Sequence, residues 1–208
     1  MVVLSICIPT YNRASHLNNC LSSLIQCGLG KIPEVQVCIS DNCSTDTTKK
    51  VVIEAEKVLA IKYNINKSNL GFARNMLEVV KMADGEFVWV IGDDDLLMLG
   101  ACEKIIALIT KYRTVDFFVV NANHLTTEYV HSFSQPFSLS NLPRTMKPFS
   151  LRTESGEMPF LKLIDPKICF DYLGGIYLSV FRRSLWLANT GCLDEAAICD
   201  DRSLSHPD

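Results

Sequence analysis

The chain has 208 residues, of which 48% are hydrophobic and 21% charged, and its formal net charge is −3. This length suits one domain with a substantial core, and the composition is typical of a globular α/β protein. The acidic balance and the scattered Lys and Arg residues argue against a nucleic-acid-binding protein, which would carry a basic footprint, and against a polybasic membrane-binding segment.

The N-terminus and the cysteines indicate where the protein works. The apolar start has no basic leader, so we expect a first strand there and not a secretion signal. No stretch reaches the ~18 apolar residues that a membrane-spanning helix needs. The nine cysteines form no CxxC pair, and free buried thiols indicate a reducing compartment. The four histidines are dispersed, so we expect no zinc site. We predict a cytoplasmic protein, with peripheral association at the inner face of the membrane as the alternative.

Short apolar runs alternate with helical periodicity over the first 122 residues. Near-continuous apolar runs predict strands that are covered on both faces, and apolar residues three and four apart predict the helices between them. Ser15 is the expected cap of the first helix, and Ser44 or Asp46 that of the second. The alternation predicts a Rossmann-like α/β fold, a mainly parallel sheet sandwiched by helices. The expected strands are residues 2–8, 35–40, 61–65, 87–91 and 117–122.

The pattern changes after residue 122 and divides the single domain into residues 1–122 and 123–208. Residues 124–159 are rich in Ser, Thr, Pro and Asn and show no period. A loop of this length is functional or mobile in most domains, and a disordered insertion is the alternative. We expect a further strand at residues 176–181 and a short helix after Arg183.

Unusual polar residues collect where the first four predicted strands end. The carboxyl ends of parallel strands lie along one edge of a sheet, where α/β proteins bind ligands in a crevice. We therefore expect four loops to converge there. Helix capping explains any one of them, but it does not explain Arg13, Arg74 and an acidic triplet together. The four loops comprise residues 9–13, 41–46, 69–75 and 93–95.

Three consecutive aspartates, Asp93, Asp94 and Asp95, follow the fourth predicted strand. Adjacent carboxylates repel one another unless a cation neutralises them, and hard oxygen ligands favour Mg²⁺ or Mn²⁺. In an extended segment Asp93 and Asp95 would point in similar directions, so that one could bind the metal and the other a ribose hydroxyl. The alternative is that Asp95 caps a helix that begins near Leu96.

The other loops offer groups that suit a phosphorylated nucleotide. Arg13 and Arg74 can neutralise phosphate, and so can the exposed amides of the turn at Gly71. Asp41 is a short acceptor that can hold a base or a ribose. An ordinary role in a turn is the alternative for each of these residues.

The four loops resemble segments of family 2 glycosyltransferases, which have the GT-A fold. Residues 5–13 are similar to the family's first-strand signature, and residues 37–46 to its V-D-(D/N)-x-S-x-D segment. Residues 69–75 match its N-x-G region, and residues 92–95 (Gly-Asp-Asp-Asp) look like its DxD element. In the second half, residues 174–183 and 191–195 resemble acceptor-side segments.

Residues 199–204 resemble the E-D-x-D-L motif that carries the family's general base. The chain departs from this motif, with Asp200 in place of Glu and Ser203 in place of the later Asp. The resemblance implies that the base is Asp201, then Asp200, then Asp194 in order of preference. A solvated acidic tail is the alternative for these three residues.

The resemblance implies an inverting transfer of a sugar from a nucleoside diphosphate to an acceptor hydroxyl. Residues 1–122 would bind the nucleotide sugar and residues 123–208 would face the acceptor. Mg²⁺ or Mn²⁺ would be held by Asp95, with Asp93 or Asp94 assisting. The implied donor site comprises Pro9, Thr10, Tyr11, Arg13, Asp41, Asn69, Gly71, Arg74, Asp93 and Asp94.

The expected partners are a nucleoside-diphosphate sugar and a glycan or lipid-linked oligosaccharide, as in surface-polysaccharide enzymes. The Gly-Asp-Asp-Asp and Phe-Arg-Arg segments are similar to those of O-antigen enzymes that add deoxysugars such as abequose. A sugar-phosphate nucleotidylyltransferase is one alternative, although residues 9–13 lack the glycine-rich basic loop of that class. The other is a truncated, non-catalytic nucleotide-sugar binder, because the sequence ends four residues after the base-like motif.

Overall fold

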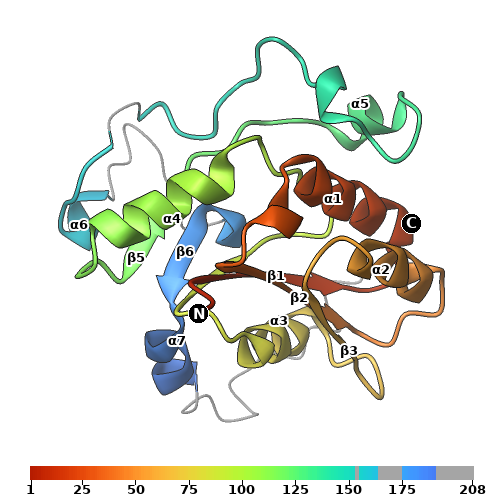
Figure 1. The fold of residues 1–208 in the computed structure, drawn as a ribbon, viewed down its shortest axis with the longest axis horizontal. Coiled ribbons are helices and arrows are strands. Elements are labelled where there is room, and N and C mark those ends of the chain that lie inside the picture. Colours follow the sequence, from red (N-terminus) through yellow and green to blue (C-terminus); the bar gives the residue numbers. More distant parts are fainter. Residues whose placement is uncertain (153–154, 164–174, 191–208) are drawn as a thin grey trace.

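The computed structural model describes residues 1–152, 155–163 and 175–190, and within them one six-stranded sheet has the order β3-β2-β1-β4-β6-β5 (Figure 1). The first four strands are mutually parallel, whereas β6 is antiparallel to both β4 and β5. The predicted mainly parallel sheet is therefore confirmed. The strands are β1 (Leu4–Thr10), β2 (Val35–Asp41), β3 (Ile61–Ile65), β4 (Phe87–Val90), β5 (Phe117–Val119) and β6 (Ser179–Arg182).

Helices lie on both faces of the sheet, with α1, α2 and α4 on one face and α3 and α7 on the other (Figure 1). The helices are α1 (Ala14–Gln26), α2 (Thr48–Glu56), α3 (Phe72–Met82), α4 (Ala101–Lys111), α5 (Thr127–His131), α6 (Phe160–Leu163) and α7 (Arg183–Thr190). Short 3-10 helices are η1 (Leu29–Lys31), η2 (Leu139–Asn141) and η4 (Ile176–Leu178).

Strand β1 is the centre of the core, since all seven of its residues are buried. Side chains alternate along a strand, so Ile6 and Ile8 pack against α1 and α2, whereas Cys7 packs against Val79 of α3. Burial on both faces explains why this part of the sequence is nearly continuously apolar and does not alternate.

Asp46 organises the start of two helices. Its carboxylate accepts hydrogen bonds from the amides of Ala14, at the start of α1, and of Thr48, at the start of α2, both at 2.9 Å. The cap position of α2 is occupied by Thr47, so neither predicted residue, Ser44 or Asp46, is the cap, although Asp46 satisfies the first amide of the helix. The predicted cap Ser15 is wrong, because α1 already begins at Ala14 and its first amide is satisfied by a residue distant in sequence.

Three predicted strands differ from the observed ones by two or more residues at an end, and the strand expected at residues 2–8 is Leu4–Thr10. The strand expected at residues 117–122 ends at Val119, and the one expected at 176–181 begins as the 3-10 helix η4 before β6. β6 inserts between β4 and β5, so that Val180 pairs with Trp89 on one side and with Phe118 on the other. Hydrophobic runs identify strands but carry no information about their order in the sheet.

Residues 123–150, here called the crossing segment, are ordered and pack over the α1 and α4 side of the molecule (Figure 1). The segment contains α5 and η2, and a β-bridge joins Asn123 to Pro148. Phe137 is fully buried, and its amide donates to Oδ1 of Asn19 at 2.8 Å. For residues 124–150 the alternative of a disordered insertion is therefore wrong. A single buried aromatic residue in a polar sequence gave too weak a signal to predict this anchor.

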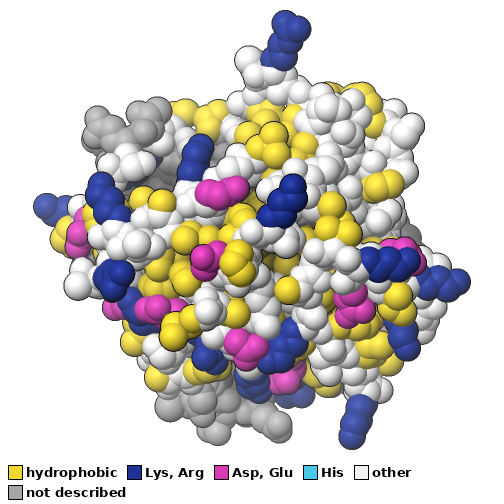
Figure 2. Space-filling view, in the orientation of Figure 1, with side chains coloured by type: hydrophobic (Ala, Val, Ile, Leu, Met, Phe, Trp, Pro, Cys, Tyr) yellow, Lys and Arg dark blue, Asp and Glu magenta, His cyan; other side chains and the backbone are white. Residues whose placement is uncertain are grey.

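Charged side chains are spread over the face of the molecule in Figure 2, where Lys and Arg lie singly among acidic and uncharged side chains. Within the described residues, no helix has the length and apolar character needed to cross a membrane. The cysteines in the described part of the chain are free thiols, and Cys7, Cys20 and Cys38 are among those that are buried.

Candidate functional site

A cavity of about 2020 Å³ lies at the carboxyl ends of β1 and β4, between the start of α3 and the crossing segment. All four predicted loops line it, the loop of residues 41–46 through Asn42, which is the convergence expected at the edge of a parallel sheet. Of the residues predicted to bind donor or metal, those that line the cavity are Pro9, Thr10, Tyr11, Arg13, Asn69, Gly71, Arg74, Asp93, Asp94 and Asp95.

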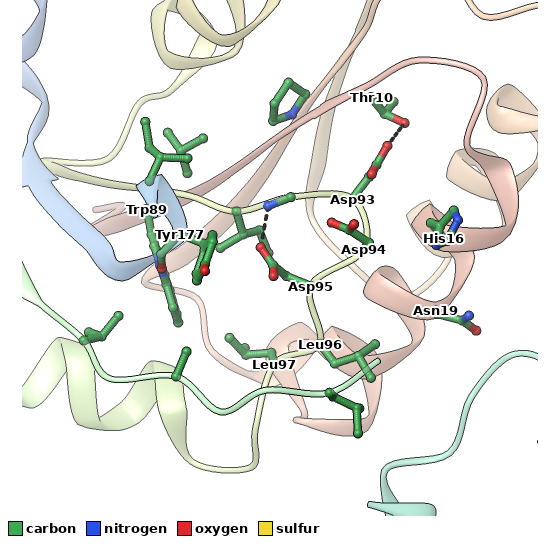
Figure 3. Close-up of a pocket in the computed structure, with 18 of the residues that line it drawn as sticks. Thr10, His16, Asn19, Trp89, Asp93, Asp94, Asp95, Leu96, Leu97 and Tyr177 are labelled. Atoms are coloured by element: carbon green, nitrogen blue, oxygen red, sulfur yellow. Dashed lines mark hydrogen bonds between the residues drawn. The ribbon is translucent and has the colours of Figure 1, made fainter. Parts of the chain in front are cut away.

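Asp93 is held by the end of β1. Its side chain is 5% exposed, and the Thr10 hydroxyl donates to Oδ2 at 2.7 Å (Figure 3). The guanidinium of Arg13 lies 3.1 Å from its other oxygen, Oδ1, and also pairs with Asp94 at 2.9 Å. Both oxygens of Asp93 therefore have partners, one at the end of β1 and one in the loop that follows it.

The aspartate segment forms a turn, so the prediction that Asp93 and Asp95 point in similar directions is wrong. Asp93 points toward Thr10, whereas Asp95 folds back and accepts a hydrogen bond from the amide of Gly92 at 2.6 Å (Figure 3). Asp95 does not cap a helix near Leu96 either, because α4 begins at Ala101. β4 ends at Val90, so that Ile91 and Gly92 separate it from the aspartates, and the alternation of side chains ends with the strand.

Gly92 leaves space for two of the carboxylates. A Cβ atom at this position would lie 2.6 Å from Oδ1 of Asp94 and 3.2 Å from Oδ2 of Asp95. The oxygens of Asp94 and Asp95 thus approach the same point beside the backbone, and only glycine leaves that point open. The sequence contained this signal as a glycine directly before the aspartates, but its role was not predicted.

Burial makes the charges of this turn costly. It raises the pKa of Asp93 to about 6, against the opposing effects of Arg13 and the Thr10 hydroxyl. It also raises the pKa of Asp95 to about 6, and the neighbouring charges of Asp94 and Asp93 add to the rise. Shifts of this kind are typical of functional carboxylates.

The residues of the turn suit a divalent ion that is shared with a phosphorylated ligand. No group of three or more His, Cys, Asp or Glu side chains is arranged as a complete metal cage in the described ranges. The carboxylates at Gly92 would supply part of a coordination shell, and Mg²⁺ in nucleotide enzymes is held in this way by one or two carboxylates and the substrate's phosphates. The donor set therefore fits such an ion.

Asp41 lies beneath the site and does not line the cavity. Its side chain is buried, with the Tyr63 hydroxyl donating to one oxygen at 2.7 Å and the amide of Ser44 to the other at 2.8 Å. Among the described contacts it braces the loop after β2, and its partners come from β3 and from its own loop.

A network of asparagines fixes the loop before α3. Sequence reasoning placed Asn69 in the donor site but did not predict the network. Asn42 accepts from the amide of Leu70 at 2.8 Å and donates to Asn69 at 2.7 Å. The side-chain amide of Asn66 donates to the side-chain oxygens of both Asn42 and Asn75, and Asn75 donates to the carbonyl of Ser40. The repeated asparagines at residues 42, 66, 69 and 75 were the available signal.

Gly71 and Arg74 come to the cavity at the start of α3. Gly71 precedes the helix with φ +80° and ψ 162°, a combination that is open almost only to glycine. Arg74 lies in the first helical turn, half-buried, and lines the cavity. The predicted base residues Asp194, Asp200 and Asp201 lie outside the described residues.

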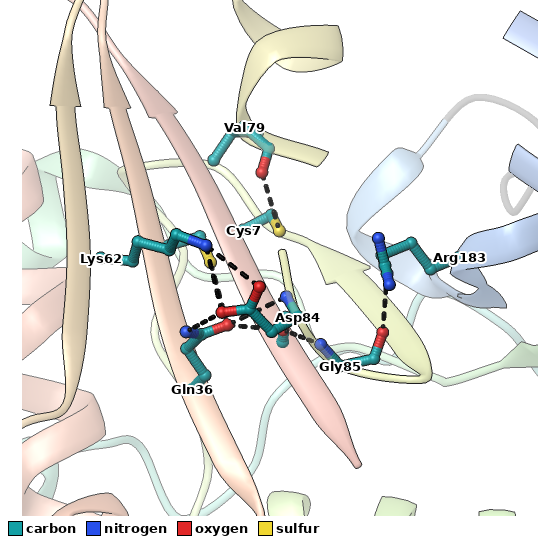
Figure 4. Close-up of polar contacts among 9 residues, drawn as sticks. Cys7, Gln36, Lys62, Val79, Asp84, Gly85 and Arg183 are labelled. Atoms are coloured by element: carbon teal, nitrogen blue, oxygen red, sulfur yellow. Dashed lines mark hydrogen bonds and ion pairs between the residues drawn. The ribbon is translucent and has the colours of Figure 1, made fainter. Parts of the chain in front are cut away.

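A second polar cluster lies at the opposite, amino edge of the sheet (Figure 4). Asp84 accepts from Gln36 at 3.0 Å and pairs with Lys62 at 3.0 Å, and the amide of Gly85 donates to the Ser5 hydroxyl at 2.9 Å. Arg183 donates to the carbonyl of Gly85. These contacts join the starts of β1, β2, β3 and α7, so their role is structural.

The fold and the cavity define a GT-A-like α/β protein with a ligand site at the carboxyl edge of its sheet. The fold is similar to that of crystal structures of S. aureus TarS 1-349, with a TM-score of 0.58 at 21% identity over 90% of this chain and 49% of that chain. The complex of the same protein with UDP gives a TM-score of 0.56 at 19% identity, with the same shares covered.

The family follows from the sequence match. A profile described as Glycosyl transferase family 2 matches residues 5–164. The chain belongs to this family.

Two further proteins are similar to parts of the chain. Abequosyltransferase RfbV of Salmonella typhimurium is 39% identical over 98 residues, which are 46% of this chain and 29% of that protein. The mannosyltransferase PcManGT from Pyrobaculum calidifontis, solved with GDP-Man and Mn²⁺, has a TM-score of 0.50 at 20% identity over 58% of this chain and 35% of that chain. The chain spans less than half the length of each of these relatives.

Proposed function

We propose that the chain acts as a metal-dependent, inverting glycosyltransferase that moves a sugar from a nucleoside diphosphate to a hydroxyl of a glycan or lipid-linked oligosaccharide. The observation that carries this proposal is the convergence of cationic, acidic and glycine residues at one cavity. Arg13 and Arg74 line it together with the turn of three aspartates. Family membership supports the same reaction class.

In this proposal the first half of the chain binds the donor. Arg13, Arg74 and the backbone at Gly71 neutralise and orient the diphosphate. Tyr11, which is 43% exposed at the cavity, offers a ring face on which a base can stack. Asp41 supports donor binding indirectly, by holding the loop after β2 in place. Asn69, which lies at the surface of the cavity, offers its side-chain amide to the donor as a hydrogen-bonding group.

The metal, Mg²⁺ or Mn²⁺, would be held by Asp95 together with Asp93 and Asp94. When bound, the ion neutralises the charge that the departing diphosphate gathers. Gly92 leaves room beside the backbone for an oxygen of Asp94 and one of Asp95, and Thr10 fixes Asp93. The PcManGT complex with Mn²⁺ supports a metal in a protein of similar fold.

A general base on the face opposite the leaving group must take the proton of the acceptor hydroxyl. Asp201 is our first choice, then Asp200 and Asp194. We expect Asp201→Asn to leave nucleotide binding unchanged and to remove transfer to acceptor. Survival of transfer in this variant would reject the assignment, and a wild-type chain that binds donor without any turnover would identify a nucleotide-sugar binder.

The proposed acceptor is a surface glycan. The abequosyltransferase RfbV and the poly(ribitol-phosphate) beta-N-acetylglucosaminyltransferase TarS both carry names that denote transfer of a sugar, in the second case to a polymer. The crossing segment, which forms the wall opposite the start of α3, is the part of the described chain that would face such an acceptor.

A thermal-shift panel tests the donor site. UDP, GDP, CDP and dTDP are each added with Mn²⁺, Mg²⁺ or EDTA, because a ligand that binds the native state raises its stability by mass action. We expect one nucleotide to raise the melting temperature in the presence of metal and EDTA to abolish the rise. If folded protein gives no shift with any nucleotide, the donor assignment is wrong.

A further inference from the structure

The guanidinium of Arg13 bridges two of the three aspartates. Its Nη1 lies 3.1 Å from Oδ1 of Asp93, and its Nη2 lies 2.9 Å from Oδ2 of Asp94. Asp93 is almost fully buried, whereas Arg13 and Asp94 are 43% and 45% exposed. Arg13 is thus a cation of the chain itself that offsets part of the negative charge of the turn.

This arrangement occupies the oxygens that a divalent ion would need. The Thr10 hydroxyl takes Oδ2 of Asp93, and Arg13 takes Oδ1. The fork of the guanidinium is well matched to carboxylates, so an ion that approaches Asp93 must compete with it. Asp95 differs from its two neighbours, because its bond is to the amide of Gly92 and no ion pair to it occurs among the described residues.

We propose that Arg13 is an internal counter-ion that competes with the divalent cation for Asp93 and Asp94, and that it transfers to the diphosphate when nucleotide and metal bind together. The proposal rests on the proposed function of the cavity. It makes Arg13 a coupling residue: the nucleotide draws the guanidinium away from the carboxylates, and the metal displaces it toward the nucleotide. By linkage, each ligand then raises the affinity of the other by the same factor.

Arg74 supplies a matched control for Arg13. It lines the same cavity from the first turn of α3 and forms no ion pair within the described residues. Both arginines would contact the diphosphate, but only Arg13 would oppose the metal. The start of α1 depends on the backbone of Arg13, whose carbonyl accepts from the amide of Leu17, so a change of its side chain leaves this contact intact.

The test measures Mn²⁺ binding without nucleotide, from the free-Mn²⁺ EPR signal, in wild type, Arg13→Gln, Arg13→Lys and Arg74→Gln. We expect Arg13→Gln to bind Mn²⁺ about fivefold more tightly than wild type, as befits the loss of a partly exposed ion pair. The Mn²⁺ affinity of Arg13→Lys, which keeps the positive charge but lacks the planar guanidinium, should lie between those of wild type and Arg13→Gln. Arg74→Gln should bind Mn²⁺ as tightly as wild type.

The second arm measures the affinity for the nucleotide that the panel selects, with Mn²⁺ present. Both glutamine variants should bind it more weakly, so the two effects of Arg13→Gln have opposite signs. Unchanged or weaker Mn²⁺ binding by folded Arg13→Gln overturns the proposal, as does an absence of binding in wild type and variant alike. If Arg13→Gln gains Mn²⁺ affinity while wild type binds no nucleotide, the competition is right and the donor assignment is wrong.

Discussion

At the scale of single residues, burial decides how the aspartate turn behaves. Carboxylates that are removed from water favour the protonated form, and Asp93 and Asp95 both follow this rule. Such a turn costs stability unless a cation is bound. A site that is unfavourable for the fold and lies at the ligand edge of the sheet is the pattern expected of function.

Asp95→Asn should therefore stabilise the metal-free protein. Burial raises the pKa of Asp95 from 3.8 to about 6, so the folded state holds the proton more tightly than the unfolded chain does. Stability then falls as pH rises from the unfolded pKa through the folded one. Asparagine can still accept from the amide of Gly92. We expect the variant to gain up to about 3 kcal/mol at pH 7.5 and little at pH 4.

Urea unfolding in EDTA at several pH values measures this gain. The difference between variant and wild type should grow between pH 4 and pH 7. A variant that is less stable than wild type at neutral pH would mean that the Asp95 charge stabilises the fold. Added Mn²⁺ should stabilise the wild type and not the variant.

The sequence predicted the set of residues that line the cavity more accurately than the directions in which their side chains point. Asp93, Asp94 and Asp95 were expected at this edge because a strand precedes them, and they lie there. The turn that separates their side chains depends on where β4 ends, and periodicity does not fix element ends within a residue or two. Asp41 was expected in the cavity, but its partner Tyr63 comes from β3, a contact that no local pattern reveals.

At the scale of elements, long-range polar contacts set the positions of helices and strands. Asp46 serves the starts of both α1 and α2, which places the loops after β1 and β2 next to each other. The hydrogen bonds from Thr48 and Ala14 outweigh the effect of burial and lower the pKa of Asp46. Its contribution is therefore present near neutral pH and is lost in acid.

The amino edge of the sheet depends on a close backbone approach at Gly85 (Figure 4). A Cβ atom there would lie 2.7 Å from the amide nitrogen of Ser5 and 2.8 Å from the carbonyl oxygen of Phe87, and neither backbone group can move aside freely. We expect Gly85→Ala to destabilise the fold by about 1–3 kcal/mol, as overpacking does.

Gly156→Ala is the control for this change, because no atom lies within 4 Å of its added Cβ. Its free energy of unfolding in urea should stay within about 0.5 kcal/mol of wild type. Equal stability of the two variants would show that β1 and the residues before β4 are not in tight contact at Gly85.

At the scale of the whole molecule, the sheet brings together loops that are far apart in sequence. Thr10 and Asp93 are 83 residues apart and share a hydrogen bond because β1 and β4 are neighbours. The parallel order of strands was predictable from the alternation of strands and helices. The antiparallel β6 between β4 and β5 was not, since its length and apolar character would suit either direction.

The crossing segment shows the limit of sequence reasoning at this scale. Its Ser, Thr, Pro and Asn content resembles that of a loop, yet Phe137 and Leu139 anchor it to α1 through Asn19 and Gln26. These anchors depend on the surface of α1, which exists only in the folded protein. The cavity wall that would face an acceptor is thus the part of the site that composition predicted least well.

The most direct test of the account is calorimetric titration of the nucleoside diphosphate selected by the thermal-shift panel, into wild type and Asp95→Asn, with Mn²⁺ and with EDTA. We expect the nucleotide to bind wild type only with Mn²⁺ and not to bind Asp95→Asn, with both proteins folded. Equal affinity in EDTA, or full metal-dependent affinity in the variant, would contradict a metal-assisted donor site at the aspartate turn.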